Sequence, residues 1–390
     1  MGGNSFSQKK SISVGIAGLQ DHQNFGDGVI GDCAEWLLQS NANDSQVAKI
    51  DMTKIIHFLP FRIFHKALHT LPLLKSIIPS VLVFICKKYF NSQVKKYDAI
   101  VFPGGSLIQY NQFFMYTVCG IIRAAEINNI PVFFNAVGIE GHSDSDPRCA
   151  LYKKCLNSKA VKMISTRDDI EVLKGKYIDK KSSIALSRIA DPAVFTSSVY
   201  NLAKDNDSEI IGIGVIHGNI FTNHGLDVSP SQLLDFYSDI INELEKRGLR
   251  YRLFTTGVPF DNQFVDELSK YINSAEVKEN AIIPETICEL VQCISTFKGI
   301  IAGRLHANII AYSLNVPSVG FEWSKKLSFW GVNIGFPERF TPPTELNARI
   351  AFYNLEKAIE EGYDESHRAS YMNTATTFIE EIYKTINEGA

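Results

Sequence analysis

The segment 300–326 reads IIAGRLHANIIAYSLNVPSVGFEWSKK and decides the fold of this chain. A short apolar run that ends at Gly303 predicts a buried strand, the turn after it opens an apolar helical run, and 317–322 predicts a second strand. A strand, a helix and a second strand in this order form the repeating unit of a parallel sheet wrapped by helices. The segment therefore predicts an α/β protein.

The same alternation of short β-branched runs and longer amphipathic runs extends through most of the chain in two series. We expect strands at 12–19, 47–52, 99–102, 131–138 and 161–165, and then at 209–216, 251–256, 298–303 and 317–322. No strand is expected after Phe336, where helical runs follow at 345–361 and 366–387. The pattern predicts two Rossmann-like lobes facing across a cleft, with the C-terminal helices packing across them. The expected division is 1–200, 201–340 and 341–390.

Composition limits the functions that this chain could have. Of the 390 residues, 45% are hydrophobic and 21% charged, which suffices for two cores, and the net charge of −3 gives no overall positive field for nucleic acid. The seven cysteines contain no C-x-x-C pair and the histidines have no metal-ligand spacing, so we expect a reducing compartment and no metal. The polar start lacks a signal-type apolar core, which favours a cytoplasmic location.

A basic and apolar stretch at 62–88 raises the question of membrane contact. Its longest uncharged run covers the 11 residues from Ser76 to Cys86, whereas a spanning helix needs about 20 apolar residues. Lysines and arginines bracket the stretch, as they do in helices that lie at a membrane surface. Two interpretations stay open, a core-facing helix pair and peripheral contact with the inner face of the cytoplasmic membrane.

Two loops of the first series carry residues suited to a ligand site. The loop QDHQNFGDG at 20–28 lacks the G-x-G-x-x-G spacing, and the chain has no P-loop, which disfavours the usual NAD and ATP enzymes. Asn24 and Asp27 stand at the entry to a helix expected near Val29, where Asp27 either caps the helix or faces a ligand. Gly104 and Gly105 form either a sharp turn or a surface that lets backbone amides approach a ligand.

Arg167 lies between a strand and a helix of the first series. Its guanidinium suits a carboxylate or a phosphate, but a salt bridge to Asp168, Asp169 or Asp191 is an equal alternative.

Arg304 and His306 open the helix of the segment that decides the fold. They place a guanidinium, an imidazole and helix-terminal amides together at the end of a strand, which makes an anion site. Lys325 and Lys326 follow the next strand and reach the same edge. A capping or buried role for His306 is the alternative.

Five stretches in this order resemble the polysaccharide pyruvyl transferase family. They are NFGD at 24–27, PGG at 103–105, TRD at 166–168, DPA at 191–193, and RLHA at 304–307 with SLNVP at 313–317 behind it. The resemblance implies that the pyruvyl group of phosphoenolpyruvate moves to two hydroxyls of a sugar in a bacterial polysaccharide or its lipid-linked precursor. A pyruvate ketal forms and phosphate is released, with no metal and with no cofactor beyond this donor substrate.

The resemblance implies a GT-B-like fold, and it also implies roles for individual residues. Those expected to bind phosphoenolpyruvate are Arg167, Arg304, Leu305, His306 and Lys326, with His306 and Arg304 catalytic. Those expected to bind the acceptor sugar are Asn24, Asp27, Gly104 and Gly105, so that the N-terminal lobe holds the acceptor and the C-terminal lobe the donor. Two other functions stay open, a GT-B glycosyltransferase with a nucleotide-sugar donor and a non-catalytic glycan-binding subunit.

Overall fold

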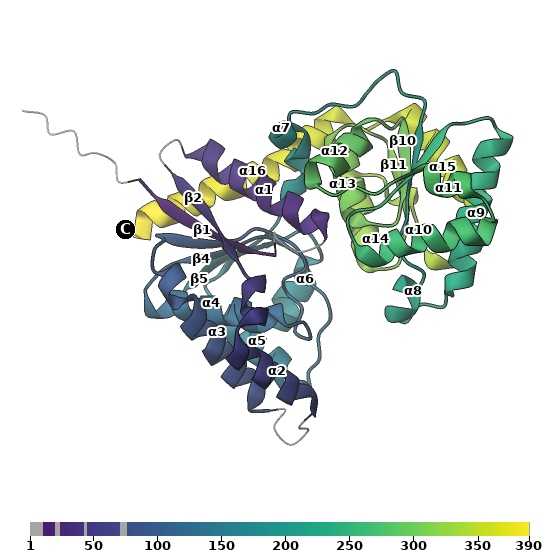
Figure 1. Ribbon diagram of the computed structural model, residues 1–390. Helices are drawn as coiled ribbons and strands as arrows, with labels where there is room; N and C mark the ends of the chain where they lie inside the picture. Colours follow the sequence, from purple (N-terminus) through teal and green to yellow (C-terminus); the bar gives the residue numbers. More distant parts are fainter. Residues whose placement is uncertain (1–10, 20–23, 43–44, 71–75, 390) are drawn as a thin grey trace, which may run out of the picture. The chain divides into compact units, whose positions relative to one another are not determined.

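The computed structural model describes residues 11–19, 24–42, 45–70 and 76–389 (Figure 1). Residues 20–23 of the first loop and 71–75 of the basic apolar stretch lie outside the described residues. The chain forms two compact units, of which unit 1 is Met1–Leu19, Ala34–Arg188 and Thr376–Ala390, and unit 2 is Gln20–Cys33 and Ile189–Ala375. These units differ from the expected ranges, because the start of helix α1 (Phe25–Asn41) packs with unit 2 and the end of helix α16 (Glu365–Gly389) packs with unit 1.

Unit 1 contains a six-stranded parallel sheet in the order β2-β1-β3-β4-β5-β6. Its strands are β1 (Ser13–Gly18), β2 (Gln46–Asp51), β3 (Ala99–Phe102), β4 (Val132–Val137), β5 (Val161–Thr166) and β6 (Ala185–Arg188). Every residue of β3 and β4 is buried, as expected for central strands covered by helices on both faces.

Helices α3, α4 and α5 cover one face of this sheet, and the second half of α1 with the end of α16 covers the other (Figure 1). The helical elements of unit 1 are η1 (Thr53–His57), α2 (Leu59–Thr70), α3 (Ile78–Val94), α4 (Phe114–Ile127), α5 (Pro147–Leu156), α6 (Ile170–Val172) and η3 (Leu173–Tyr177), besides its parts of α1 and α16. The hydroxyl of Tyr383 in α16 donates to the carbonyl of Leu38 in α1 at 2.9 Å, which fixes the C-terminal helix to this unit.

Unit 2 contains a second six-stranded parallel sheet, in the order β12-β11-β10-β7-β8-β9. Its strands are β7 (Ile211–Gly214), β8 (Tyr251–Phe254), β9 (Ala281–Ile282), β10 (Gly299–Ala302), β11 (Ser318–Phe321) and β12 (Phe340–Thr341). The central strands β7, β10 and β11 are fully buried, so this sheet also lies inside its unit.

The helices of unit 2 begin and end at recognisable signals. Pro230 follows the capping residue Ser229 at the start of α9, and Asn273 takes the left-handed conformation after α10, as Gly335 does after α14. The helical elements are η4 (Pro192–Phe195), α7 (Thr196–Tyr200), α8 (Ile220–Asn223), α9 (Pro230–Lys246), α10 (Pro259–Ile272), α11 (Ala275–Glu279), α12 (Ile287–Ser295), α13 (Leu305–Ser313), α14 (Lys325–Ile334), η5 (Pro337–Arg339), η6 (Pro343–Glu345) and α15 (Ala348–Glu361).

The structure confirms all nine strands that the sequence predicted, within a few residues at each end. The expectation that strands end at Phe336 was wrong, because β12 adds a short edge strand to β11. Of the two C-terminal helices, α15 belongs to unit 2 alone, whereas α16 contributes to both units.

None of the helices in the described part of the chain has both the length and the apolar content needed to span a membrane.

Candidate functional site

The carboxyl edge of the unit 2 sheet gathers charged and aromatic side chains from four neighbouring strands. Strands β11, β10, β7 and β8 are adjacent and parallel, so the loops that follow them meet at one edge. These loops, and the first turns of the helices after them, carry His217 after β7, Asp261 after β8, Arg304 after β10, and Trp323 and Lys326 after β11. This edge is the candidate functional site.

A buried carboxylate holds Arg304 in place. The Nε and Nη2 atoms of Arg304 donate to Oδ2 and Oδ1 of Asp261 at 2.8 and 2.7 Å. Asp261 is fully buried and also accepts the backbone N–H of His217 at 2.9 Å. The guanidinium carbon lies 5.8 Å from the centre of the Trp323 ring. The bidentate ion pair with Asp261 fixes the guanidinium plane, and Nη1 takes no part in either bond to Asp261.

The turn that carries Arg304 is itself held by side-chain hydrogen bonds. Fully buried Asn308 donates from Nδ2 to the carbonyls of Ala302 and Arg304, at 2.9 and 3.0 Å. Trp323 donates from Nε1 to the carbonyl of Gly303 at 2.6 Å. These bonds satisfy backbone acceptors where the strand ends, so the passage from β10 into α13 is fixed.

His217 is neutral at physiological pH. Burial lowers the pKa of this imidazole, the Asp261 carboxylate opposes that shift, and the Arg304 guanidinium lowers the pKa further. His217 therefore adds no positive charge to the edge near pH 7.

His306 lies in the first turn of α13, between a carboxylate and a glycine. Its Nε2 is 3.9 Å from Oδ2 of Asp191, which is 1% exposed, and its own side chain is 12% exposed. Asp191 also accepts the backbone N–H of Ala193 at 2.8 Å, so its position is fixed at the start of η4. On the other side, a Cβ atom added to Gly26 would lie 2.2 Å from Nδ1 of His306. Glycine at position 26 is therefore required for this ring to occupy its place.

The residues 24–27 belong to unit 2 through these contacts. Helix α1 begins at Phe25, four residues before the predicted start, and the N–H of Gly26 donates to Oδ1 of Asn24 at 3.2 Å. Asn24 is thus the capping residue, and the proposed capping role of Asp27 was wrong. The N–H of Phe25 donates to the carbonyl of Thr256 at 3.2 Å, next to β8. The structure therefore places Asn24 and Asp27 with His306 rather than with Gly104 and Gly105.

Lys326 lies in the first turn of α14 and is half-buried. Burial lowers its pKa to about 8, and the nearby negative charge of Asp27 acts in the opposite direction. A lysine with this pKa changes its charge readily when an anion approaches. The neighbouring Lys325 is exposed.

Leu305, also expected to contact the donor, has a buried side chain that is 7% exposed. A polar contact from this residue is therefore limited to its backbone amide, at the first position of α13.

Unit 1 holds the remaining predicted residues at the carboxyl edge of its own sheet. Gly104 and Gly105 follow β3 with φ of 134° and 77°, which explains why glycine stands at both positions. Arg167 and Asp168 follow β5 and are buried. Asp168 accepts the N–H of Ile139 at 2.8 Å, which ties the loop after β5 to the loop after β4.

The structure thus brings Arg304, Leu305, His306 and Lys326 together with Asn24 and Asp27 in unit 2, whereas Gly104, Gly105 and Arg167 lie in unit 1.

Sequence reasoning missed three residues of the unit 2 edge, which are His217, Asp261 and Trp323. Asp261 is 43 positions from Arg304 in the chain, and the available signal was Pro259, which begins a helix directly after a strand of the same sheet. Trp323 stands between β11 and the lysines, and its aromatic type at a strand end was the available signal.

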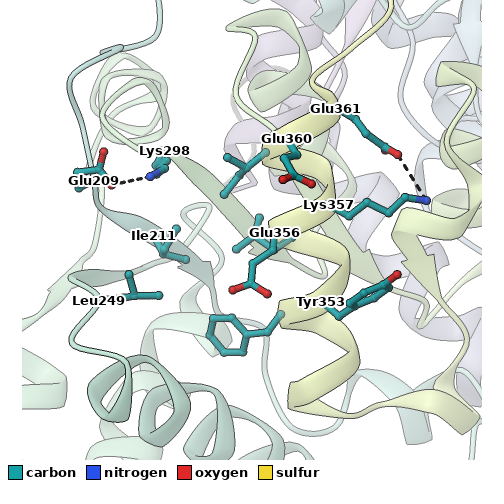
Figure 2. Close-up of a pocket in the computed structure, with 12 residues that line it drawn as sticks. Glu209, Ile211, Leu249, Lys298, Tyr353, Glu356, Lys357, Glu360 and Glu361 are labelled. Carbon is teal, nitrogen blue, oxygen red and sulfur yellow. Dashed lines mark hydrogen bonds and ion pairs between the residues drawn. The ribbon is translucent and has the colours of Figure 1, made fainter.

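A cavity of about 740 Å³ lies elsewhere in unit 2 (Figure 2). Ile211 begins β7 and Lys298 precedes β10, so the cavity adjoins the amino ends of the strands, opposite the edge that carries Arg304. Lys298 pairs with Glu209 at 2.5 Å, and on α15 Lys357 pairs with Glu361 at 3.5 Å. Because its lysines are neutralised in this way, the cavity offers no concentrated charge for an anion.

Known proteins share the fold and motifs of this chain. The family model for polysaccharide pyruvyl transferase matches residues 24–325. No curated protein matches the chain. The UDP-GlcNAc 2-epimerase from Methanocaldococcus jannaschii is 11% identical with a TM-score of 0.58, covering 96% of this chain and 100% of that one. The glycosyltransferase SnogD from Streptomyces nogalater is 12% identical with a TM-score of 0.51, covering 97% and 100%.

The UDP-GlcNAc 2-epimerase from Neisseria meningitidis, solved with bound UDP-GlcNAc, is 11% identical with a TM-score of 0.57, covering 95% of this chain and 99% of that one. At such identities these likenesses show the fold alone. They confirm the predicted α/β architecture of two Rossmann-like lobes of the GT-B type.

Proposed function

Because the chain belongs to the polysaccharide pyruvyl transferase family, we propose that it transfers the pyruvyl group of phosphoenolpyruvate to a sugar. Two hydroxyls of the sugar receive the group as a ketal, and inorganic phosphate is released. The acceptor is a sugar of a bacterial polysaccharide or of its lipid-linked precursor, and the reaction takes place on the cytoplasmic side of the membrane.

The carboxyl edge of the unit 2 sheet is the observation that supports this proposal. Phosphoenolpyruvate carries a carboxylate and a phosphate on a three-carbon frame. Helices α13 and α14 begin at this edge, and their first amides and dipoles favour anions. Lys326 adds an ammonium group, and Arg304 adds a guanidinium that Asp261 holds in one orientation. These groups suit the carboxylate and the phosphate of phosphoenolpyruvate, although Asp261 offsets part of the positive charge of Arg304.

His306 is the residue that we assign to proton transfer. A proton from His306 adds to the methylene carbon of phosphoenolpyruvate, and a sugar hydroxyl adds to the adjacent carbon and returns a proton to the ring. The bond from that carbon to the phosphate oxygen then breaks, and the second hydroxyl closes the ketal as its proton leaves with the phosphate. The buried Asp191 carboxylate near Nε2 stabilises positive charge on the ring before and after the transfer.

The test separates donor binding from turnover. Phosphoenolpyruvate should raise the midpoint of thermal unfolding, since a ligand that binds only the folded state stabilises it. His306→Gln should retain this rise but release no phosphate from phosphoenolpyruvate in the presence of a set of sugar acceptors. Lys326→Met should weaken the rise, while Lys357→Met, on the far edge of the same unit, should leave it unchanged.

Arg304→Ala is unsuitable for this test because it would leave the buried carboxylate of Asp261 without its ion-pair partner and so destabilise the fold. Full phosphate release by His306→Gln would contradict the assigned role. A thermal rise with nucleotide sugars and none with phosphoenolpyruvate would replace the proposal with a glycosyltransferase. Saturable sugar binding without phosphate release would indicate a glycan-binding protein.

A further inference from the structure

Unit 1 contains a long segment without acidic residues. From Met52 to Tyr97 there is no Asp or Glu, whereas eight residues are Lys or Arg. The whole chain carries a net charge of −3, so this segment has the opposite sign to the protein around it. It folds into η1, α2 and α3, which are consecutive elements of unit 1.

The same elements expose large apolar side chains. Leu59 and Ile63 are 63% and 56% exposed, and Phe64 on the same helix and Phe84 of α3 are 38% and 48% exposed. We call the exposed surface that Leu59, Ile63 and Phe64 form on α2 the α2 face. Phe84 lies apart from it, in a groove that Arg123 and Ile127 of α4 also line. Apolar exposure extends to Ile56 in η1 and to Phe58 between η1 and α2, so it begins before the stretch 62–88 that the sequence indicated.

Packing on the inner side of α2 fixes the orientation of this helix, so that its outer side chains stay exposed. Phe61 is 2% exposed, and its ring centre lies 6.4 Å from that of Tyr116 in α4. Phe58 contacts Tyr89 of α3 with ring centres 5.3 Å apart, and α2 lies beside α3 in Figure 1. The predicted core-facing packing therefore describes only one side of α2. The other side of this helix is apolar and exposed.

Basic side chains accompany the apolar ones. Arg62 and Lys66 are exposed on α2, between and beside the apolar positions. An apolar surface accompanied by Lys and Arg, without acids, is typical of helices that lie at the boundary of an anionic bilayer.

We propose that the α2 face docks unit 1 on a membrane surface that contains anionic lipids. The apolar side chains of α2 enter the headgroup boundary while Arg62 and Lys66 contact lipid phosphates. The combination of basic and apolar side chains favours a membrane over a protein or a nucleic acid as the partner. The cores of protein interfaces are depleted of lysine. Exposed aliphatic side chains do not suit nucleic acid. The docking stands on this surface alone and does not depend on the reaction proposed for unit 2.

Sedimentation with vesicles tests the proposal. The full chain should bind vesicles of phosphatidylcholine with phosphatidylglycerol, and should bind pure phosphatidylcholine weakly. Neutralising Arg62 and Lys66 to Gln should weaken binding to the anionic vesicles by about fivefold per charge. The matched pair Lys357→Gln and Lys384→Gln, from other surface helices, should leave it unchanged.

The apolar contribution is tested by Leu59→Ser with Ile63→Ser, for which we expect a loss of about tenfold or more. Both side chains are largely exposed, so the variant should keep its thermal midpoint. Val332→Ser in unit 2, at a residue that is 56% exposed, is the matched control. Equal binding by all variants would overturn the proposal. The proposal would also be overturned if Leu59→Ser with Ile63→Ser changed the oligomeric state in sedimentation velocity but still bound vesicles. The exposed apolar side chains of α2 would then pack against a second copy of the chain.

Discussion

Replacing Asp261 with Asn should destabilise unit 2 by about 3 kcal/mol, the lower end of the range for breaking a buried ion pair. The carboxylate is fully buried and accepts three hydrogen bonds, two from Arg304 and one from the N–H of His217. Asparagine keeps one acceptor oxygen but turns an amide donor toward the guanidinium. The penalty lies at the lower end because the Arg304 side chain is 17% exposed and retains some hydration.

The assay must report on unit 2 by itself. Trp36 lies in unit 1, whereas Trp323 and Trp330 lie in unit 2, so a Trp36→Phe background confines the fluorescence signal to unit 2. Urea unfolding of the full chain in this background gives the free energy of unfolding. In a thermal melt we expect the midpoint to fall by about 6–12 °C for a unit of this size.

Two comparisons make the prediction refutable. Asp266→Asn on the same helix removes an exposed ion pair with Lys278, and should leave the free energy of unfolding almost unchanged. Combining Asp261→Asn with Arg304→Met should cost about 2 kcal/mol less than the sum of the two single changes, because the partners are coupled. A cost for Asp261→Asn no greater than that of Asp266→Asn, or strict additivity with Arg304→Met, would refute the reasoning.

Two further predictions concern the same edge of unit 2. Gly26→Ala should lose phosphate release and show none of the roughly 1 kcal/mol gain that alanine usually brings to a helix, since its Cβ would displace the His306 ring; Gly175→Ala, which meets open space, should leave activity and the urea midpoint unchanged. Because burial lowers the pKa of Lys326 from 10.5 to about 8, the native state gives up this proton before the unfolded chain does. The unfolding free energy of the wild type relative to Lys326→Met should therefore rise as the pH increases from about 8 to 10.5, and a flat difference across urea titrations in that range would contradict the lowered pKa.

The sequence predicted the central strands well because burial on both faces leaves a continuous apolar run. The elements it missed are edge strands with little such signal. Strand β6 has no buried residue, and β9 and β12 have two residues each. Strand β12 exists because it pairs with Gly320 and Phe321 of β11, and a pairing of this kind is set by tertiary packing rather than by local sequence.

The candidate site was predictable where its residues share one turn. Arg304, Leu305 and His306 adjoin one another at the start of α13, so the chain itself brings them together. The partner of Arg304 could not be predicted in this way, since Asp261 comes from another strand and carries no local mark of its role. Likewise, no pattern within 24–27 indicates that Gly26 packs against a ring 280 positions later.

The path of α16 bears on how this protein is made. Phe378, Ile379 and Ile382 are buried in unit 1, whose first strand begins at Ser13, and all of unit 2 is encoded before them. Domains usually fold in the order in which the ribosome delivers them. Here the ribosome finishes unit 2 before it supplies the last helix turns that unit 1 needs. The sheet of unit 1 therefore stays incompletely covered until residues 376–390 have been synthesised, and loss of these residues would damage unit 1 rather than unit 2.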